Sequence, residues 1–196
     1  CRQAMTDRVV AHQGAACWAT LFTHAHYLPC LAVLLQSMRA CQTRYPLVVM
    51  VTETVDARTR ERLTRMGCVL RDVDAWRVPH ADGSLAFERF QNVWTKLRAF
   101  ELYEYERVVM IDSDMLMCHN MDELFDRPLE RGMIAAALAC TCNPKQIPTY
   151  PAEWTPRNCG YALRPHPPND TRQLTKPTHR LINSGVVVLE PSQEQH

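Results

Sequence analysis

Four consecutive apolar residues, at positions 108–111, run directly into Asp112-Ser113-Asp114. Such a run is typical of a strand buried on both faces of a parallel sheet. Open α/β sheets bind their ligands at the carboxyl ends of the strands, which is where this strand places two carboxylates. Neighbouring carboxylates repel each other unless a cation lies between them, and Mg²⁺ and Mn²⁺ prefer oxygen ligands. The motif therefore predicts a divalent cation that carries a phosphorylated substrate, with a solvated Asp/Ser turn as the alternative.

The rest of the chain alternates between predicted strands and predicted helices. Apolar residues recur at the helical period after Pro29, which suits the first turn of a helix. We expect strands at 16–23, 47–51, 69–73 and 181–190, and helices at 28–42, 56–66, 94–105 and 121–126. Residues 133–139 fit either a strand or a buried helix. This alternation predicts βαβ units and an α/β fold with a mostly parallel sheet flanked by helices.

Residues 143–180 differ from this pattern because proline is frequent and apolar periodicity is absent. An irregular segment of this length is typical of a functional loop or a disordered insertion. We expect an N-terminal tail at 1–15 and a single domain at 16–196. Because the chain begins with Cys1 and stops at His196 as a new element would start, we also expect it to be a partial chain, truncated at its C-terminus.

Charge and composition exclude several classes of function. The chain has 22 basic and 21 acidic side chains, a balance that predicts neither nucleic-acid binding nor attraction to a membrane surface. No apolar run approaches the roughly 18 residues of a membrane span. These properties are those of an ordinary globular protein.

The nine cysteines are odd in number and irregularly spaced. Cys140-x-Cys142 lacks a second pair or a nearby histidine that would complete a zinc site, and Cys118 with His119 matches no known ligand spacing. Most of the cysteines are therefore predicted to be small buried residues in a reducing compartment, which favours the cytoplasm.

Five sequence blocks, taken in order, resemble the retaining glycosyltransferases of family 8, which include glycogenin and galactinol synthase. The blocks are 19–23 with Tyr27, 94–97, 112–114, 120–125 and 182–186. The likeness covers about residues 16–193, and the segment 140–144 with the proline-rich insertion is closest to uncharacterised fungal members. This resemblance implies a GT-A fold, a Rossmann-like sheet that binds a nucleotide-sugar.

The resemblance also implies roles for individual residues. Asp112 and Asp114 would hold Mn²⁺, or Mg²⁺, against the diphosphate of a UDP-sugar, and Ser113 would lie along the ribose. Leu21, Thr23 and Tyr27 would contact the uridine, although His24 stands where the family has asparagine. For Leu21 and Tyr27 a place in the hydrophobic core is the alternative.

Further assignments concern the phosphate and the donor sugar. Lys96 matches a family lysine that pairs with phosphate or with an acid near the sugar, while a lysine that reaches solvent along apolar neighbours is the alternative. Arg89 is a candidate for an upstream arginine, with its spacing shifted by two. Asn183 and Ser184 would contact the donor sugar, since an amide buried among apolar residues needs polar partners. Gly185 is also explained by a bulge or a close backbone approach.

Two family segments are absent from this chain: His-x-x-Gly-x-x-Lys-Pro, which supplies a third metal ligand, and Gly-Asp-Gln, whose acid lies near the reacting carbon. We therefore assign no catalytic residue, place the third ligand beyond His196, and expect the segment alone to be a poor catalyst. Asp122 and Glu123 are assigned to the first turn of a short helix, where carboxylates complement the helix dipole.

The sequence thus predicts a metal-dependent retaining hexosyltransferase that uses UDP-glucose or UDP-galactose. The acceptor and the oligomeric state are undetermined, and a homodimer is one option. One alternative is a nucleotide-sugar-binding module without turnover. A haloacid-dehalogenase-type phosphatase is disfavoured by Leu116, where that family has Thr or Val. A nucleotidyltransferase is disfavoured because residues 20–30 contain no Gly, Lys or Arg.

Overall fold

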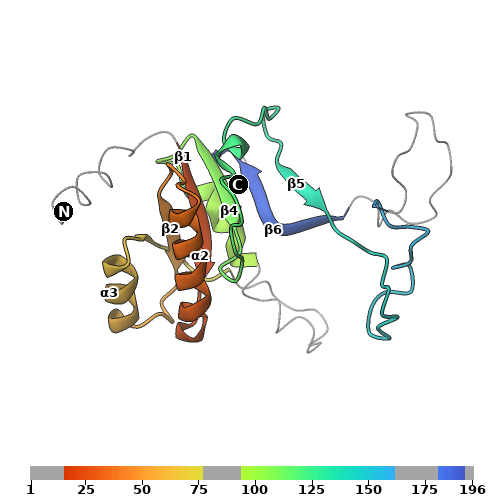
Figure 1. The fold of residues 1–196 in the computed structure, drawn as a ribbon, viewed down its shortest axis with the longest axis horizontal. Coiled ribbons are helices and arrows are strands. Elements are labelled where there is room, and N and C mark those ends of the chain that lie inside the picture. Colours follow the sequence, from red (N-terminus) through yellow and green to blue (C-terminus); the bar gives the residue numbers. More distant parts are fainter. Residues whose placement is uncertain (1–15, 77–93, 162–180, 193–196) are drawn as a thin grey trace. The chain divides into compact units, whose positions relative to one another are not determined.

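The computed structural model describes residues 16–76, 94–161 and 181–192. Six strands form one sheet in the order β3-β2-β1-β4-β6-β5, and the pairs β1/β2, β1/β4 and β2/β3 are parallel (Figure 1). The bounds of the strands are β1 Ala16–Phe22, β2 Leu47–Val51, β3 Val69–Asp72, β4 Arg107–Ile111, β5 Ala135–Leu138 and β6 Ile182–Leu189. The predicted α/β fold with a mostly parallel sheet is confirmed.

The central strands are almost entirely buried, as their apolar sequences predicted. Every residue of β2 is buried, and β1 has only Leu21 half-buried. Trp18 on β1 is fully buried and its ring meets Phe125 edge-on at 5.1 Å between centroids. Strands covered on both faces are typical of parallel sheets with crossover helices.

Two α-helices connect the first three strands. Helix α2, Leu28–Ala40, begins with Pro29 in its first turn and buries the apolar residues that gave its period. Helix α3, Ala57–Arg65, is capped by Asp56, whose side chain accepts a hydrogen bond from the Thr59 N–H at 2.9 Å. The chain leaves α3 through Gly67, which has a φ of 86°, a left-handed conformation that glycine adopts without strain.

The helices predicted at 94–105 and 121–126 are shorter than expected. Both are 3₁₀ helices, η2 at Thr95–Glu101 and η3 at Asp122–Leu124, and a third, η1 at Ala25–Tyr27, precedes α2. Within η2 only Thr95 and Ala99 are buried, so tertiary packing supports a short element rather than three α-helical turns. Residues 133–139, which fitted either type of element, contain strand β5.

The contacts divide the chain into two compact units. The first contains the described residues up to Ala135 and those from Val187 onward, and the second is Ala136–Val186. The second unit holds most of β5, the start of β6 and an irregular stretch at 139–161. The single domain predicted at 16–196 stays a prediction, and the tail at 1–15 lies outside the described residues.

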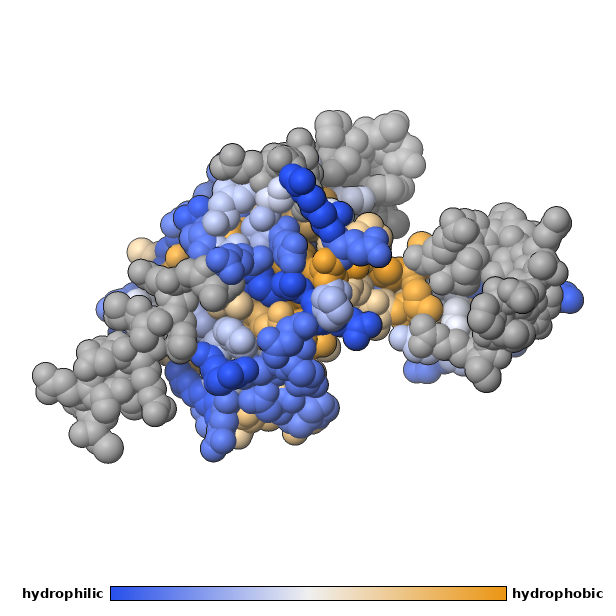
Figure 2. Space-filling view, turned by 90° about the horizontal axis from the view of Figure 1, so that it is seen from above, coloured by the Kyte–Doolittle hydropathy of each residue, from blue (hydrophilic) through white to orange (hydrophobic). Residues whose placement is uncertain are grey.

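The described surface is largely polar. In the view of Figure 2, hydrophilic side chains cover most of the described part of the molecule, and apolar residues show between them. Among the described residues, no helix combines the length and the apolar character that a membrane crossing needs.

Candidate functional site

The Asp-Ser-Asp motif lies directly at the carboxyl end of β4. Val108 to Ile111 are buried, Asp112 and Ser113 are half-buried, and Asp114 is exposed. The Met115 N–H donates to the Asp112 carbonyl at 3.3 Å, which closes a turn across the motif. The buried strand therefore delivers two carboxylates to the surface at the sheet edge that the sequence predicted.

Lys96 on η2 reaches the first of these acids. Its Nζ donates to Asp112 Oδ1 at 2.5 Å, and the two side chains are 20% and 29% exposed. Ion pairs that are exposed to solvent contribute little to folding stability, but this pair is largely removed from water. A carboxylate has two oxygens with about four lone-pair sites, so Asp112 keeps Oδ2 for another partner. Lys96 is thus bound to an acid of the motif instead of pointing into solvent.

The end of β1 lies beside the end of β4. The two strands are in parallel register from Ala16 opposite Arg107 to Ala19 opposite Met110, so both point their carboxyl ends to the same sheet edge. Leu21, the next-to-last residue of β1, is half-buried. It can therefore present part of its side chain to a ligand at this edge.

Thr23 and Tyr27 follow β1. Thr23 is buried, its hydroxyl lies 2.8 Å from His24 Nδ1, and its carbonyl accepts a hydrogen bond from the Thr54 hydroxyl at 2.7 Å. Tyr27 is 39% exposed, so it is not a core residue, and its ring contacts that of His26 at 4.1 Å between centroids, with the two ring planes tilted by 40°. The exposed His26 was not among the predicted site residues, because it matches no position of the sequence blocks that carried the resemblance.

Asn183 and Ser184 belong to the second unit, which is described by itself. Both are exposed at the start of β6, and Asn183 Oδ1 accepts a hydrogen bond from the Gly185 N–H at 2.8 Å. The premise that the Asn183 amide is buried among apolar residues is wrong, because β6 becomes buried only from Gly185 onward. A role for Asn183 in sugar binding therefore depends on the family resemblance alone.

Asp122 lies in the first turn of η3, as predicted, but it is buried because its carboxylate binds residues of another loop. Its carboxylate accepts hydrogen bonds from the Thr43 hydroxyl, from the Arg44 N–H at 2.9 Å and from the Asn120 amide at 3.5 Å. Burial by itself raises the pKa of this carboxyl, but these hydrogen bonds outweigh it and hold the pKa below its ordinary value. Asp122 thus ties the loop after β4 to the loop between α2 and β2, consistent with its omission from the site.

The predicted burial of most cysteines is wrong for the described part of the chain. Only Cys17, Cys68 and Cys159 are buried there; Cys30, Cys41 and Cys142 are half-buried, and Cys118 and Cys140 are exposed. Burial raises the pKa of the Cys68 thiol to about 11, which keeps it protonated and inert.

Three cysteines of the second unit lie together, which the sequence did not reveal. The Sγ atoms of Cys140, Cys142 and Cys159 all lie within 4.8 Å of one another. Cys159 lies within the proline-rich segment 143–180, far along the chain from Cys140 and Cys142, so no known ligand spacing connected it with that pair. Arg89 and His196, both considered in the sequence, lie outside the described residues.

No family model matches the chain. Galactinol synthase 2 of Ajuga reptans is 31% identical over 161 residues, which are 81% of this chain and 52% of that protein. Galactinol synthase 5 of Arabidopsis thaliana is 27% identical over 190 residues, 95% of this chain and 55% of that protein. The chain thus spans about half the length of these curated relatives.

Solved structures agree in fold. The apo structure of the bifunctional glycosyltransferase WbbM matches 94% of this chain and 32% of its own, with a TM-score of 0.59 and 18% identity. The galactosyltransferase LgtC, solved with donor and acceptor sugar analogues, matches 91% of this chain and 59% of its own, with a TM-score of 0.57 and 14% identity. The predicted resemblance to galactinol synthase-like glycosyltransferases, and the GT-A fold that it implies, are therefore confirmed.

Proposed function

We propose that the protein to which this chain belongs transfers a hexose from a UDP-sugar to an acceptor with retention of configuration, as a family 8 glycosyltransferase. The observation that carries the proposal is the pair Asp112 and Asp114 at the carboxyl edge of the sheet, with Lys96 bound to Asp112. The similarity to galactinol synthases supports the same chemistry.

The donor set fits a hard divalent cation. Asp112 and Asp114 supply carboxylate oxygens, which Mn²⁺ and Mg²⁺ prefer, and Asp114 is exposed where a diphosphate could approach. These two residues would hold Mn²⁺, or Mg²⁺ in its place. A bound cation would neutralise the charge that develops on the UDP leaving group. Lys96 occupies only Oδ1 of Asp112 and adds a positive charge on the same side of the motif.

The other proposed contacts divide between the nucleotide and the sugar. Leu21, Thr23 and Tyr27 would bind the uridine, and Ser113 would lie along the ribose. Asn183 and Ser184 would contact the donor sugar. UDP-glucose and UDP-galactose are the proposed donors, and the acceptor is unidentified. A cytoplasmic location and a homodimer stay predictions.

Calorimetric titration tests the nucleotide site. UDP, UDP-glucose and UDP-galactose are titrated with and without Mn²⁺ into the wild-type chain and into the variants Asp112→Asn and Asp114→Asn. We expect binding that requires Mn²⁺ and that weakens at least about tenfold in either variant, since even groups that only support metal ligands have effects of this size. Asp126→Asn, which alters an exposed carboxylate elsewhere, is the matched control.

Binding without Mn²⁺ at unchanged affinity in both variants would contradict the metal–diphosphate assignment. Lys96→Met is informative in the same titration. If Lys96 assists phosphate binding, the variant binds UDP more weakly although both acids are intact. A UDP-sugar hydrolysis assay on the full-length gene product then separates a transferase from a binding module without turnover.

A further inference from the structure

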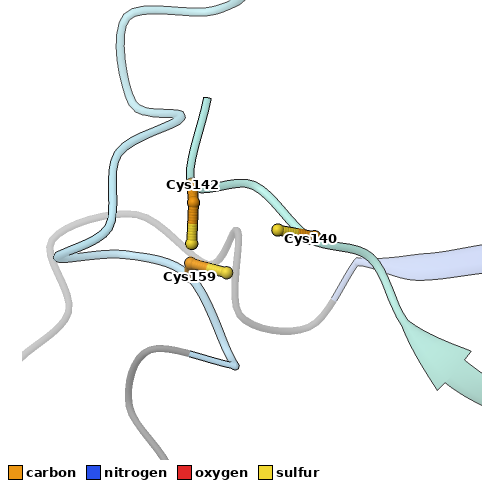
Figure 3. Close-up of side chains that lie close together, drawn as sticks. All are labelled: Cys140, Cys142 and Cys159. Carbon is orange, nitrogen blue, oxygen red and sulfur yellow. The ribbon is translucent and has the colours of Figure 1, made fainter. Parts of the chain in front are cut away.

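The second unit contains a cluster of three thiols, none of which is among the residues proposed to bind the nucleotide-sugar. Cys140 and Cys142 follow strand β5, and Cys159 comes from a later turn of the irregular stretch. Figure 3 shows the sulfur of Cys140 pointing toward the other two, and the side chains of Cys142 and Cys159 meeting. All three Sγ atoms lie within 4.8 Å of one another.

This spacing is close to that of a thiolate metal site. With a Zn–S distance of about 2.3 Å, tetrahedral coordination separates the sulfurs by about 3.8 Å. The observed limit of 4.8 Å exceeds that value by about 1 Å, which rotations of the side chains can supply.

Hydrogen bonds that do not involve sulfur hold both ends of the cluster in place. The Ala139 N–H donates to the Leu181 carbonyl at 2.8 Å, directly before Cys140. Asn143, with a φ of 43°, turns the chain after Cys142, and its Oδ1 accepts from the Ile147 N–H at 2.9 Å. The Cys159 N–H donates to a carbonyl three residues earlier at 3.4 Å. The cluster is therefore built on defined turns.

The stretch that carries the cluster has little else to stabilise it. Residues 139–161 contain no helix or strand, and within them only Thr141, Cys159 and Gly160 are buried. Segments without an adequate hydrophobic core usually need a disulfide or a structural metal. Cys140, Cys142 and Cys159 are thiols in this structure.

We propose that Cys140, Cys142 and Cys159 bind a zinc ion as thiolates, with the fourth ligand supplied from outside these three cysteines. Thiolates favour zinc and other soft metals over Mn²⁺ and Mg²⁺, which the carboxylates of the Asp-Ser-Asp motif prefer, so the two sites differ in the metals that they favour. Each thiol that coordinates loses its proton to solvent, which makes binding weaker at low pH. Cys140 is exposed and gives the ion a path of entry.

Metal analysis tests this site. The chain is purified under reducing conditions without chelators, and zinc is measured by plasma mass spectrometry. We expect about one zinc per chain in the wild type, and a loss of at least about tenfold in Cys140→Ser, Cys142→Ser and Cys159→Ser. Cys118→Ser, which changes another exposed cysteine, keeps its zinc. Asp112→Asn also keeps it, so failure of this proposal is distinguishable from failure of the proposed function.

An alkylation assay on the wild type covers the case in which a cysteine variant does not fold. Cys140 and Cys118 are both exposed, so without zinc both react with N-ethylmaleimide. Added zinc should protect Cys140 at least about tenfold and leave Cys118 reactive. Equal reaction of both residues in zinc, absence of zinc from the wild type after zinc titration, or a disulfide among the three cysteines in reducing buffer would each overturn the proposal.

Discussion

Replacing Asp122 by asparagine should destabilise the first unit strongly, although the side chain keeps its shape. Asp122 is 5% exposed and its carboxylate accepts from the Thr43 hydroxyl and the Arg44 N–H. The amide that replaces it can accept from Thr43, but its NH₂ group then faces the Arg44 N–H. Weakening one charge-assisted hydrogen bond costs about 1 kcal/mol, and leaving one donor unpaired costs about 1–3 kcal/mol.

We therefore expect Asp122→Asn to lower the free energy of unfolding at pH 7 by about 3 kcal/mol. For a chain of this length the melting temperature would fall by about 6–12 °C. Urea unfolding followed by circular dichroism measures the free energy, and calorimetry measures the melting temperature. Asp126→Asn, at an exposed position four residues later, should stay within about 0.5 kcal/mol of the wild type.

The pH dependence supplies a second check on Asp122. The pKa of the folded state lies below the ordinary value, so the stabilisation is complete above the unfolded pKa of about 3.9 and disappears as pH falls through the folded pKa. The difference between wild type and Asp122→Asn should accordingly be constant near neutrality and shrink below about pH 4. A difference under about 0.5 kcal/mol at pH 7, or one that does not shrink in acid, would refute this account.

Two further predictions concern the surroundings of α3. Gly67→Ala should destabilise by about 1–2 kcal/mol in urea unfolding, because φ is 86° and the added Cβ would lie 3.0 Å from Arg39 Nη2; an unchanged midpoint would contradict this. Arg60→Met should destabilise by about 2 kcal/mol, because Arg60 donates to two backbone carbonyls at 2.8 Å and pairs with Asp72. Arg65→Met, which removes only an exposed ion pair, should change stability by less than about 0.5 kcal/mol, and equal losses in the two variants would disprove the distinction.

Much of the fold was predictable because its signals are local. The short apolar runs at β1, β2 and β4 indicated buried strands, and the residues of α2 that recur at the helical period form its buried face. The helix predicted at 56–66 contains α3, which the structure shows capped by Asp56 and followed by the left-handed Gly67. The lengths of η2 and η3 were not predictable, since they depend on how much of each segment packs against the sheet.

The place of the acidic motif in the sheet was predictable, but the contacts of the other candidate residues were not. A buried strand followed by two carboxylates is enough to place Asp112 and Asp114 at a sheet edge. The ion pair between Lys96 and Asp112, and the exposure of Asn183, depend on how η2 and β6 are oriented, which no local pattern records. Family resemblance supplied candidate roles there, but it could not supply contacts.

By itself, the sequence determined the alternation of elements, the parallel sheet and the edge at which the acidic motif lies, because hydrophobic periodicity and chain order are properties of neighbouring residues. Only the tertiary structure decided which distant side chains meet. It brought Thr43 and Arg44 to Asp122, and Cys159 to Cys140 and Cys142. Contacts of this kind depend on turns and packing across many residues, so they cannot be predicted from the spacing of residues along the chain.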